Sequence, residues 1–181
     1  FPVTKNYGSP NSEILSFKPE KISGNKIFPD WIRRKGYEHC FSWNKIYRAD
    51  MFMFIRYPEG EVFEDTYITP ILYSSSENVY YSDCGFYYYY DNEESISNSH
   101  SFDSYFFLFR NLAALHEKCA AIPELHDEAH RILLRCIDNL TDLCRCSDCE
   151  KDKLKEAVEL VKERRINIGT LYKTEFSLKQ K

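Results

Sequence analysis

The apolar residues between positions 105 and 161 recur at intervals of three and four, and this spacing restricts the possible folds more than any other feature of the chain. Side chains spaced in this way lie on one face of an α-helix, and that face must be buried against another element. Pro123 divides the region, because proline suits the first turn of a helix and not its interior. The spacing therefore predicts three helices. Their apolar stripes are Tyr105, Leu108, Phe109, Leu112, Leu115, His116 and Cys119, then Leu125, Ala129, Ile132, Leu133, Cys136, Ile137 and Leu140, and finally Leu154, Ala157, Val158 and Val161.

The first half of the chain has a different pattern, in which short aromatic runs are separated by turn residues. Aromatic and β-branched residues favour strands, and Pro58 and Gly60 favour a tight turn between two of them. We therefore expect an α+β fold, in which an aromatic-rich antiparallel sheet is followed by a three-helix C-terminal half. The expected strands lie at 51–55, 62–63, 67–68, 71–73, 79–81 and 86–90, and a hairpin joins the first of them to the next.

The length of 181 residues suits one domain with one hydrophobic core. We expect that domain to consist of an extended arm (1–26), a mainly β part (27–91), a mainly α part (101–166) and a tail (167–181). No stretch approaches the roughly 20 uninterrupted apolar residues of a membrane span, so none is expected. The chain begins with Phe1 and Pro2 and without a charged and then apolar leader, which favours a processed mature chain or a domain of a longer protein.

Helix geometry predicts that Cys119 and Cys136 do not pair with each other. If the chain turns back at Pro123, Cys119 lies about four residues before the turn and Cys136 about thirteen after it, which offsets them by roughly 13 Å along the helix axes. A disulfide needs Cα atoms only about 4.4 to 6.8 Å apart. We therefore expect two buried, unpaired thiols, which are more compatible with the cytoplasm or nucleus than with secretion.

The turn after the second expected helix holds three further cysteines, Cys144, Cys146 and Cys149. A fourth thiolate from the first half would complete a tetrahedral zinc site, and Cys40 is the preferred candidate, with Cys84 or His39 as substitutes. We expect this structural zinc to join the two halves of the chain. The open alternative is a secreted, disulfide-bonded protein, with which the glycosylation sequon starting at Asn139 is compatible.

Charge is segregated along the chain, with a net +5 in residues 1–48, −13 in 49–150 and +4 in 151–181. Cations alternate with aromatic rings in the first block, and outward tyrosines follow in the aromatic run near position 88. Such residues bury a large area on binding, so we expect a protein partner, with single-stranded nucleic acid as an alternative. The expected partner-binding residues are Trp31, Arg33, Arg34, Lys35, Tyr88 and Tyr90.

The sequence offers only one candidate catalytic motif. His126 and His130 are one helical turn apart and could hold a hydrolytic metal, but the neighbouring Glu128 is displaced from the His-Glu-x-x-His order that places a general base. Glycine-rich phosphate loops and serine-nucleophile motifs are also missing. We therefore expect a non-catalytic protein-interaction module. The alternatives are a secreted disulfide-bonded ligand or surface-binding protein, a nucleic-acid-binding module and a metal-dependent hydrolase.

Overall fold

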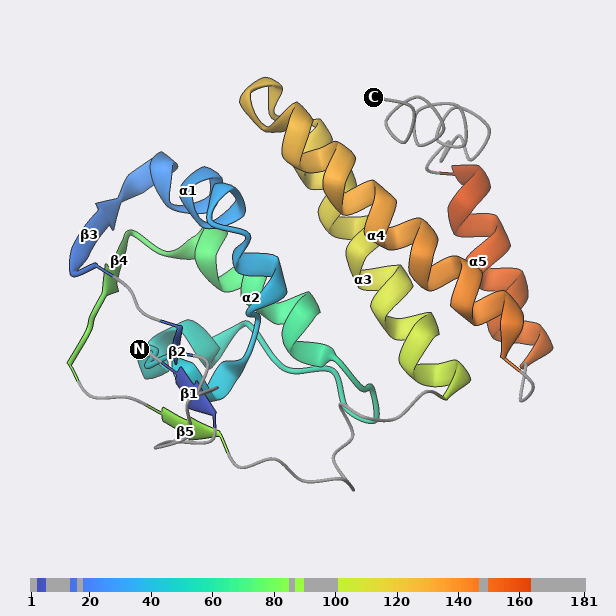
Figure 1. Cartoon of the computed structure of the whole chain (residues 1–181), viewed down its shortest axis with the longest axis horizontal. Coiled ribbons are helices and arrows are strands. Elements are labelled where there is room, and N and C mark those ends of the chain that lie inside the picture. Colours follow the sequence, from blue (N-terminus) through green and yellow to red (C-terminus); the bar gives the residue numbers. More distant parts are fainter. Residues whose placement is uncertain are drawn as a thin grey trace. The chain divides into compact units, whose positions relative to one another are not determined.

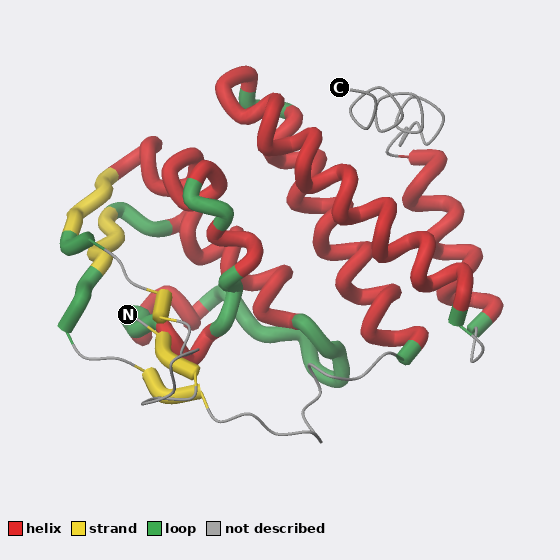
Figure 2. Tube along the Cα trace, viewed as in Figure 1, coloured by secondary structure: helices red, strands yellow, loops and turns green. Residues whose placement is uncertain are grey.

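The computed structural model describes residues 3–5, 14–15, 18–84, 87–89, 101–146 and 150–163 (Figures 1 and 2). The chain divides into two compact units, Phe1–Ser99 and His100–Lys181. Strands occur in the first unit and helices in both, so the expected α+β class is confirmed. The organisation as a single domain stays a prediction. Among the described residues, no helix is both long enough and apolar enough to cross a membrane.

The N-terminal unit is built around two helices, α1 (Ile27–Arg33) and α2 (Glu64–Ser75). They pack on each other through buried apolar residues, chiefly Ile27, Phe28 and Ile32 of α1 and Ile68 and Leu72 of α2. Short 3₁₀ turns at Gly24–Lys26, Gly36–Glu38, Ser42–Asn44 and Ala49–Met53 connect these elements. The core of this unit is therefore mainly helical.

Trp31 anchors the core of the N-terminal unit. Its side chain is only 2% exposed, and its ring stacks on that of Tyr73 with 4.9 Å between centroids. The backbone of Gly36 lies against the indole so closely that a Cβ atom at this position would lie 2.0 Å from Trp31 Nε1. Glycine is therefore the residue that the packing of Trp31 requires at position 36.

Two small sheets complete the N-terminal unit. Strands β3 (Glu20–Ser23) and β4 (Asn78–Tyr81) form an antiparallel pair with Glu20 opposite Tyr81. In the other sheet, β1 (Val3–Lys5) lies between β2 (Ile14–Leu15), which is antiparallel to it, and β5 (Tyr87–Tyr89), which is parallel to it. The parallel pair joins residues that are far apart in sequence.

Several expected strands are wrong, and with them the mainly β character of residues 27–91. Residues 51–53 belong to the 3₁₀ turn Ala49–Met53, and residues 67–68 and 71–73 belong to α2. The buried positions Ile68 and Leu72 are four residues apart, which is the spacing of a helix face, and Glu64 and Asp65 stabilise its first turn. The aromatic and β-branched composition was therefore misleading, whereas the strands expected near 79–81 and 86–90 are present as β4 and β5.

The C-terminal unit confirms the expected three-helix half. It comprises α3 (Phe102–Ala120), α4 (His126–Arg145), preceded by a 3₁₀ turn at Pro123–Leu125, and α5 (Lys151–Glu163). Ser101 caps α3, because its Oγ accepts a hydrogen bond from the Ser104 amide at 3.2 Å. The buried side chains include Phe102, Phe106, Phe109, Leu112, Ala113, Leu115, Leu125, Ala129, Ile132, Leu140, Leu143 and Ala157.

Polar contacts join α3 to each of the other two helices. His116 Nδ1 donates to the backbone oxygen of Ala129 at 2.9 Å and so connects α3 to α4. Lys153 of α5 forms an ion pair with Asp103 in the first turn of α3. α3 therefore contacts both α4 and α5.

Candidate functional site: a cavity in the N-terminal unit

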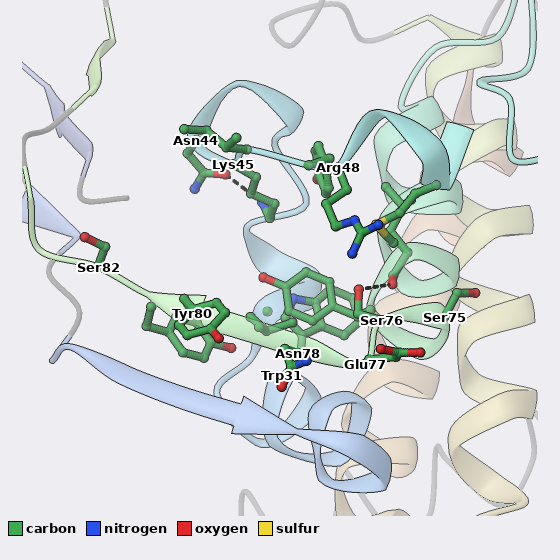
Figure 3. A pocket seen from close by; sticks show the side chains of 18 of the residues that line it. Trp31, Asn44, Lys45, Arg48, Ser75, Ser76, Glu77, Asn78, Tyr80 and Ser82 are labelled. Atoms are coloured by element: carbon green, nitrogen blue, oxygen red, sulfur yellow. Dashed lines mark hydrogen bonds between the residues drawn. The ribbon is translucent and has the colours of Figure 1, made fainter. Parts of the chain in front are cut away.

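A cavity of about 790 Å³ lies in the N-terminal unit, and this volume is typical of a ligand site. Its walls are strand β4, the end of α2 and residues 44–51, with Trp31, Arg34, Gly36 and His39 completing the lining. Figure 3 shows Asn44, Lys45 and Arg48 on one side of the cavity and Asn78 and Tyr80 on the other. All four residues of β4 line the cavity, and no residue of β3 does. The cavity therefore lies on the side of β4 that is turned away from β3.

Lys45 organises one wall of the cavity. Its Nζ donates to the backbone oxygens of His39 at 2.8 Å and Phe41 at 2.6 Å, and to Asn44 Oδ1 at 2.6 Å. The intervening carbonyl, that of Cys40, accepts a hydrogen bond from Thr69 Oγ1 at 2.8 Å. Side chains thus satisfy three consecutive carbonyls of an irregular segment, which explains how a loop can be packed against the core.

Burial controls the charge of the groups behind this wall. It lowers the pKa of Lys45 to about 8, an effect that the nearby Asp65 carboxyl opposes. It raises the pKa of Cys40 to about 12 and also raises the pKa of Asp65. The Cys40 thiol is 4% exposed, and its Sγ donates to the Tyr37 carbonyl at 3.5 Å. Cys40 is therefore a protonated thiol inside the N-terminal unit.

The arginines of the cavity are already neutralised by carboxylates. Arg34 Nη2 lies 2.6 Å from Glu20 and Nε lies 2.8 Å from Asp30, and its guanidinium lies over the ring of Tyr81 at 4.7 Å. Arg48 forms an ion pair with Asp50. The cavity thus presents compensated cations beside aromatic rings, and little unbalanced charge that would attract an anion.

The opening of the cavity carries exposed apolar side chains. Ile46 is 81% exposed and Tyr80 is 68% exposed, and both line the cavity. Met53 and Phe54, which follow the lining segment, are 65% and 91% exposed. Exposed apolar groups that line a concave surface are a feature of interaction sites, whereas a single exposed apolar side chain is not informative.

The structure distributes the expected partner-binding residues in different ways. Trp31 lines the cavity but is only 2% exposed, so its ring is not a surface contact and its part in partner binding stays a prediction. Arg33 and Lys35 are exposed, and Lys35 adopts a left-handed conformation with φ of 56°. Tyr88 is 46% exposed, and Tyr90 lies outside the described residues. Arg34 follows the last residue of α1 and contacts Asp30 and Glu20, two carboxylate partners that the sequence did not indicate.

The cavity residues Lys45, Ile46 and Tyr80 were missed as site residues. The run of cations and aromatic residues around position 45 was visible in the sequence, and the strand containing Tyr80 was expected. The cavity depends, however, on β4 lying opposite residues 44–48. That arrangement brings together segments about 30 residues apart, and no local pattern in the sequence indicates it.

The expected zinc ligands belong to different parts of the chain. Cys40 is in the N-terminal unit, Cys144 and Cys146 are in the C-terminal unit, and Cys149 lies outside the described residues. Within the described ranges, no group of three or more histidine, cysteine, aspartate or glutamate side chains is placed to hold a metal ion. The four-cysteine site stays a prediction. The substitutes also differ, since Cys84 is exposed and His39 is half-buried in the cavity wall.

The remaining candidate residues, two cysteines and two histidines, lie in the C-terminal unit on the helices that the apolar periodicity predicts. Cys119 and Cys136 are completely buried, and neither is in a disulfide. The Cys136 thiol donates to the Phe109 carbonyl at 3.8 Å. His126 and His130 lie on the first turns of α4, exposed and half-buried respectively.

Comparisons with protein families, curated proteins and solved structures gave no match for this chain. The functional argument therefore depends on the geometry of the site alone.

Proposed function

We propose that this chain is a non-catalytic protein-interaction module whose N-terminal unit binds a segment of a partner protein in the cavity beside β4. The observation that carries the proposal is the combination of a cavity of about 790 Å³ with strongly exposed Ile46 and Tyr80 at its opening. Aromatic and aliphatic groups around a concave site are typical of the anchoring regions of protein interfaces.

The electrostatics favour a protein partner over nucleic acid. Binding to phosphates needs cations that can replace counterions, but Arg34 and Arg48 already contact carboxylates. Base stacking needs accessible aromatic faces, and Trp31 is buried. The nucleic-acid alternative thus loses two of the features that motivated it.

Selection from a linear peptide library displayed on phage tests the proposal without a known partner. We expect enrichment of peptides that bind the full chain saturably and lose at least about tenfold in affinity when Ile46→Asp places a charge at the opening of the cavity. Val158→Asp is a matched control, because Val158 is an exposed apolar residue of the C-terminal unit that does not line the cavity. Failure to select saturable binders, or equal binding by Ile46→Asp, would reject the proposal.

A structural zinc ion is a separate part of the proposal, and the closely spaced Cys144, Cys146 and Cys149 support it. Metal analysis of protein purified under reducing conditions is expected to give about one zinc per chain. The double variant Cys144→Ser/Cys146→Ser should lose the metal, and the exposed Cys84→Ser serves as control. Intact mass measurements that show disulfides at these positions would instead favour the secreted alternative.

The buried thiols support a reducing compartment as the site of action. Cys119 and Cys136 are enclosed in the helical unit, where neither has a disulfide. Cytosolic and nuclear proteins keep such thiols reduced. Fractionation of cells that express the tagged full-length protein tests this placement, and recovery from the culture medium would contradict it.

A further inference from the structure

We infer that the partner segment binds as an added β-strand, paired with the edge of β4 that faces away from β3. This inference rests on the proposed function and specifies the conformation of the ligand that the cavity takes: an extended peptide with apolar residues at every second position. Strand addition of this kind supplies affinity through main-chain hydrogen bonds and specificity through alternate side chains.

The hydrogen-bond register identifies which backbone groups of β4 are available. In an antiparallel pair, residues that exchange hydrogen bonds alternate with residues that direct their backbone groups outward. The Gly24 amide donates to the Glu77 carbonyl at 3.0 Å, so this pair is of the bonded type. Because the register places Ser23 opposite Asn78 and Lys21 opposite Tyr80, these two pairs are of the other type. The amides and carbonyls of Asn78 and Tyr80 therefore point away from β3.

The cavity lies where those groups point. It is lined by all of β4 and by none of β3, and within the described ranges β4 pairs only with β3. The opposite wall is extended as well, with φ and ψ of −134° and 153° at Lys45 and −67° and 133° at Arg48. The four residues of β4 span about 13 Å, which is long enough to pair with a short peptide. An extended chain matches both walls.

The side chains and charges of the cavity specify the occupant further. Val79 and Tyr81 are half-buried on one face of β4, and Asn78 and Tyr80 are exposed on the other. An added strand continues this alternation, so its inward residues should be apolar and its outward residues polar. The arginines are compensated by carboxylates, and Lys45 is held by three oxygen acceptors. A neutral peptide backbone complements such a site better than an anion does.

Hydrogen exchange on the full-length protein tests the inference with a phage-selected peptide as probe. On binding, the amides of Asn78 and Tyr80 should become at least about tenfold more protected, because they gain acceptors. The amides of Val79 and Tyr81 should change little, since they already face β3. Uniform protection along β4, or none, would overturn the inference.

Single N-methylation of the peptide provides an independent test on unmodified protein. N-methyl groups remove main-chain donors, so affinity should fall about tenfold at every second position and little at the positions between. A comparison of Tyr80→Pro with Tyr80→Ala tests main-chain hydrogen bonding from the protein side. Both variants lack the tyrosine ring, but only the proline variant lacks the backbone amide donor at position 80. We expect the proline variant to bind about tenfold more weakly than the alanine variant.

The outcomes separate the inference from the proposed function. Peptides that bind in the cavity without alternation in the N-methyl scan would leave the proposed function standing and reject strand addition. Absence of any peptide binder would reject the proposed function itself. Protection of Asn78 and Tyr80 without peptide, increasing with protein concentration, would identify a second copy as the occupant and overturn the inference. If the amides of Asn78 and Tyr80 are protected without peptide at every protein concentration, a segment of the same chain occupies the edge of β4. That result would also overturn the inference.

Discussion

Gly36 is the position at which one added carbon should be most harmful. The substitution Gly36→Ala places a Cβ 2.0 Å from Trp31 Nε1, so either the indole or the backbone has to move. Overpacking of this kind costs roughly 1 to 3 kcal/mol, and the buried Trp31 leaves little room for relaxation. We expect the free energy of unfolding, measured by urea denaturation, to fall by at least about 2 kcal/mol.

A second glycine serves as the control for Gly36. Gly60 also belongs to the N-terminal unit, but no atom lies within 4 Å of a Cβ there, and its φ of 75° is one that asparagine tolerates. Gly60→Asn should therefore change stability much less. If Gly36→Ala is as stable as this control, the backbone of Gly36 does not pack closely against the Trp31 indole.

The cysteines should differ strongly in reactivity towards iodoacetamide. Cys84 is exposed, whereas Cys40 and Cys119 are buried and burial raises the pKa of each to about 12. Because the thiolate is the reacting species, native protein should be alkylated at Cys84 before Cys40 and Cys119. Peptide mass spectrometry after timed alkylation measures the order, and rapid labelling of Cys119 would contradict the buried position.

The raised pKa of Cys119 also predicts how stability depends on pH. Above about pH 9 the unfolded chain ionises this thiol while the folded chain, with a pKa of about 12, keeps the proton. The contribution of Cys119 to stability is therefore complete below pH 9 and is lost as pH rises towards 12. Cys119→Ala should be less stable than wild type at pH 7, and the difference should shrink at pH 10 and above. A difference that is constant with pH would contradict the shift.

At the scale of elements, α4 separates a buried face from an exposed one. Ile132 is completely buried, while the neighbouring Arg131 is exposed and forms only a surface ion pair with Glu128. Ile132→Ala should lower the free energy of unfolding by roughly 2 to 5 kcal/mol, because it leaves a cavity in the helical core. Arg131→Ala should cost less than about 0.5 kcal/mol. Equal losses of stability in the two variants, measured by thermal denaturation, would show that the buried and exposed faces of α4 are wrongly assigned.

The helices of the C-terminal unit could be predicted because their information is local. Apolar residues at helical spacing and Pro123 at a helix start define α3, α4 and α5 from the sequence alone. α2 could not be predicted in this way, since Thr66, Tyr67, Ile68 and Thr69 have strand-like composition and Pro70 lies inside the helix. Its conformation depends on tertiary contacts, among them the hydrogen bond from Thr69 to the Cys40 carbonyl. Local propensity is weak where such contacts decide.

At the scale of the whole molecule, the segregated charge does not extend to the candidate site. The cations that gave residues 1–48 a net +5 include Arg34 and Arg48, and both contact carboxylates. Affinity of a selected uncharged peptide should therefore change less than about threefold between about 50 mM and about 500 mM salt, whereas phosphate-driven binding would fall by orders of magnitude. Titration calorimetry at the two salt concentrations measures this. A steep dependence would favour the nucleic-acid alternative.

The parallel pairing of β1 with β5 has a consequence for synthesis on the ribosome. Residues 3–5 leave the exit tunnel long before their partners at 87–89, which emerge only after almost all of the N-terminal unit has been translated. The helical unit, in contrast, joins neighbours in sequence and can assemble as soon as it appears. Nascent chains stalled before residue 87 should therefore depend most on chaperones, because β1 still lacks its partner β5. A tag fused to Phe1 would lie close in sequence to this unpaired strand and would hinder its later pairing.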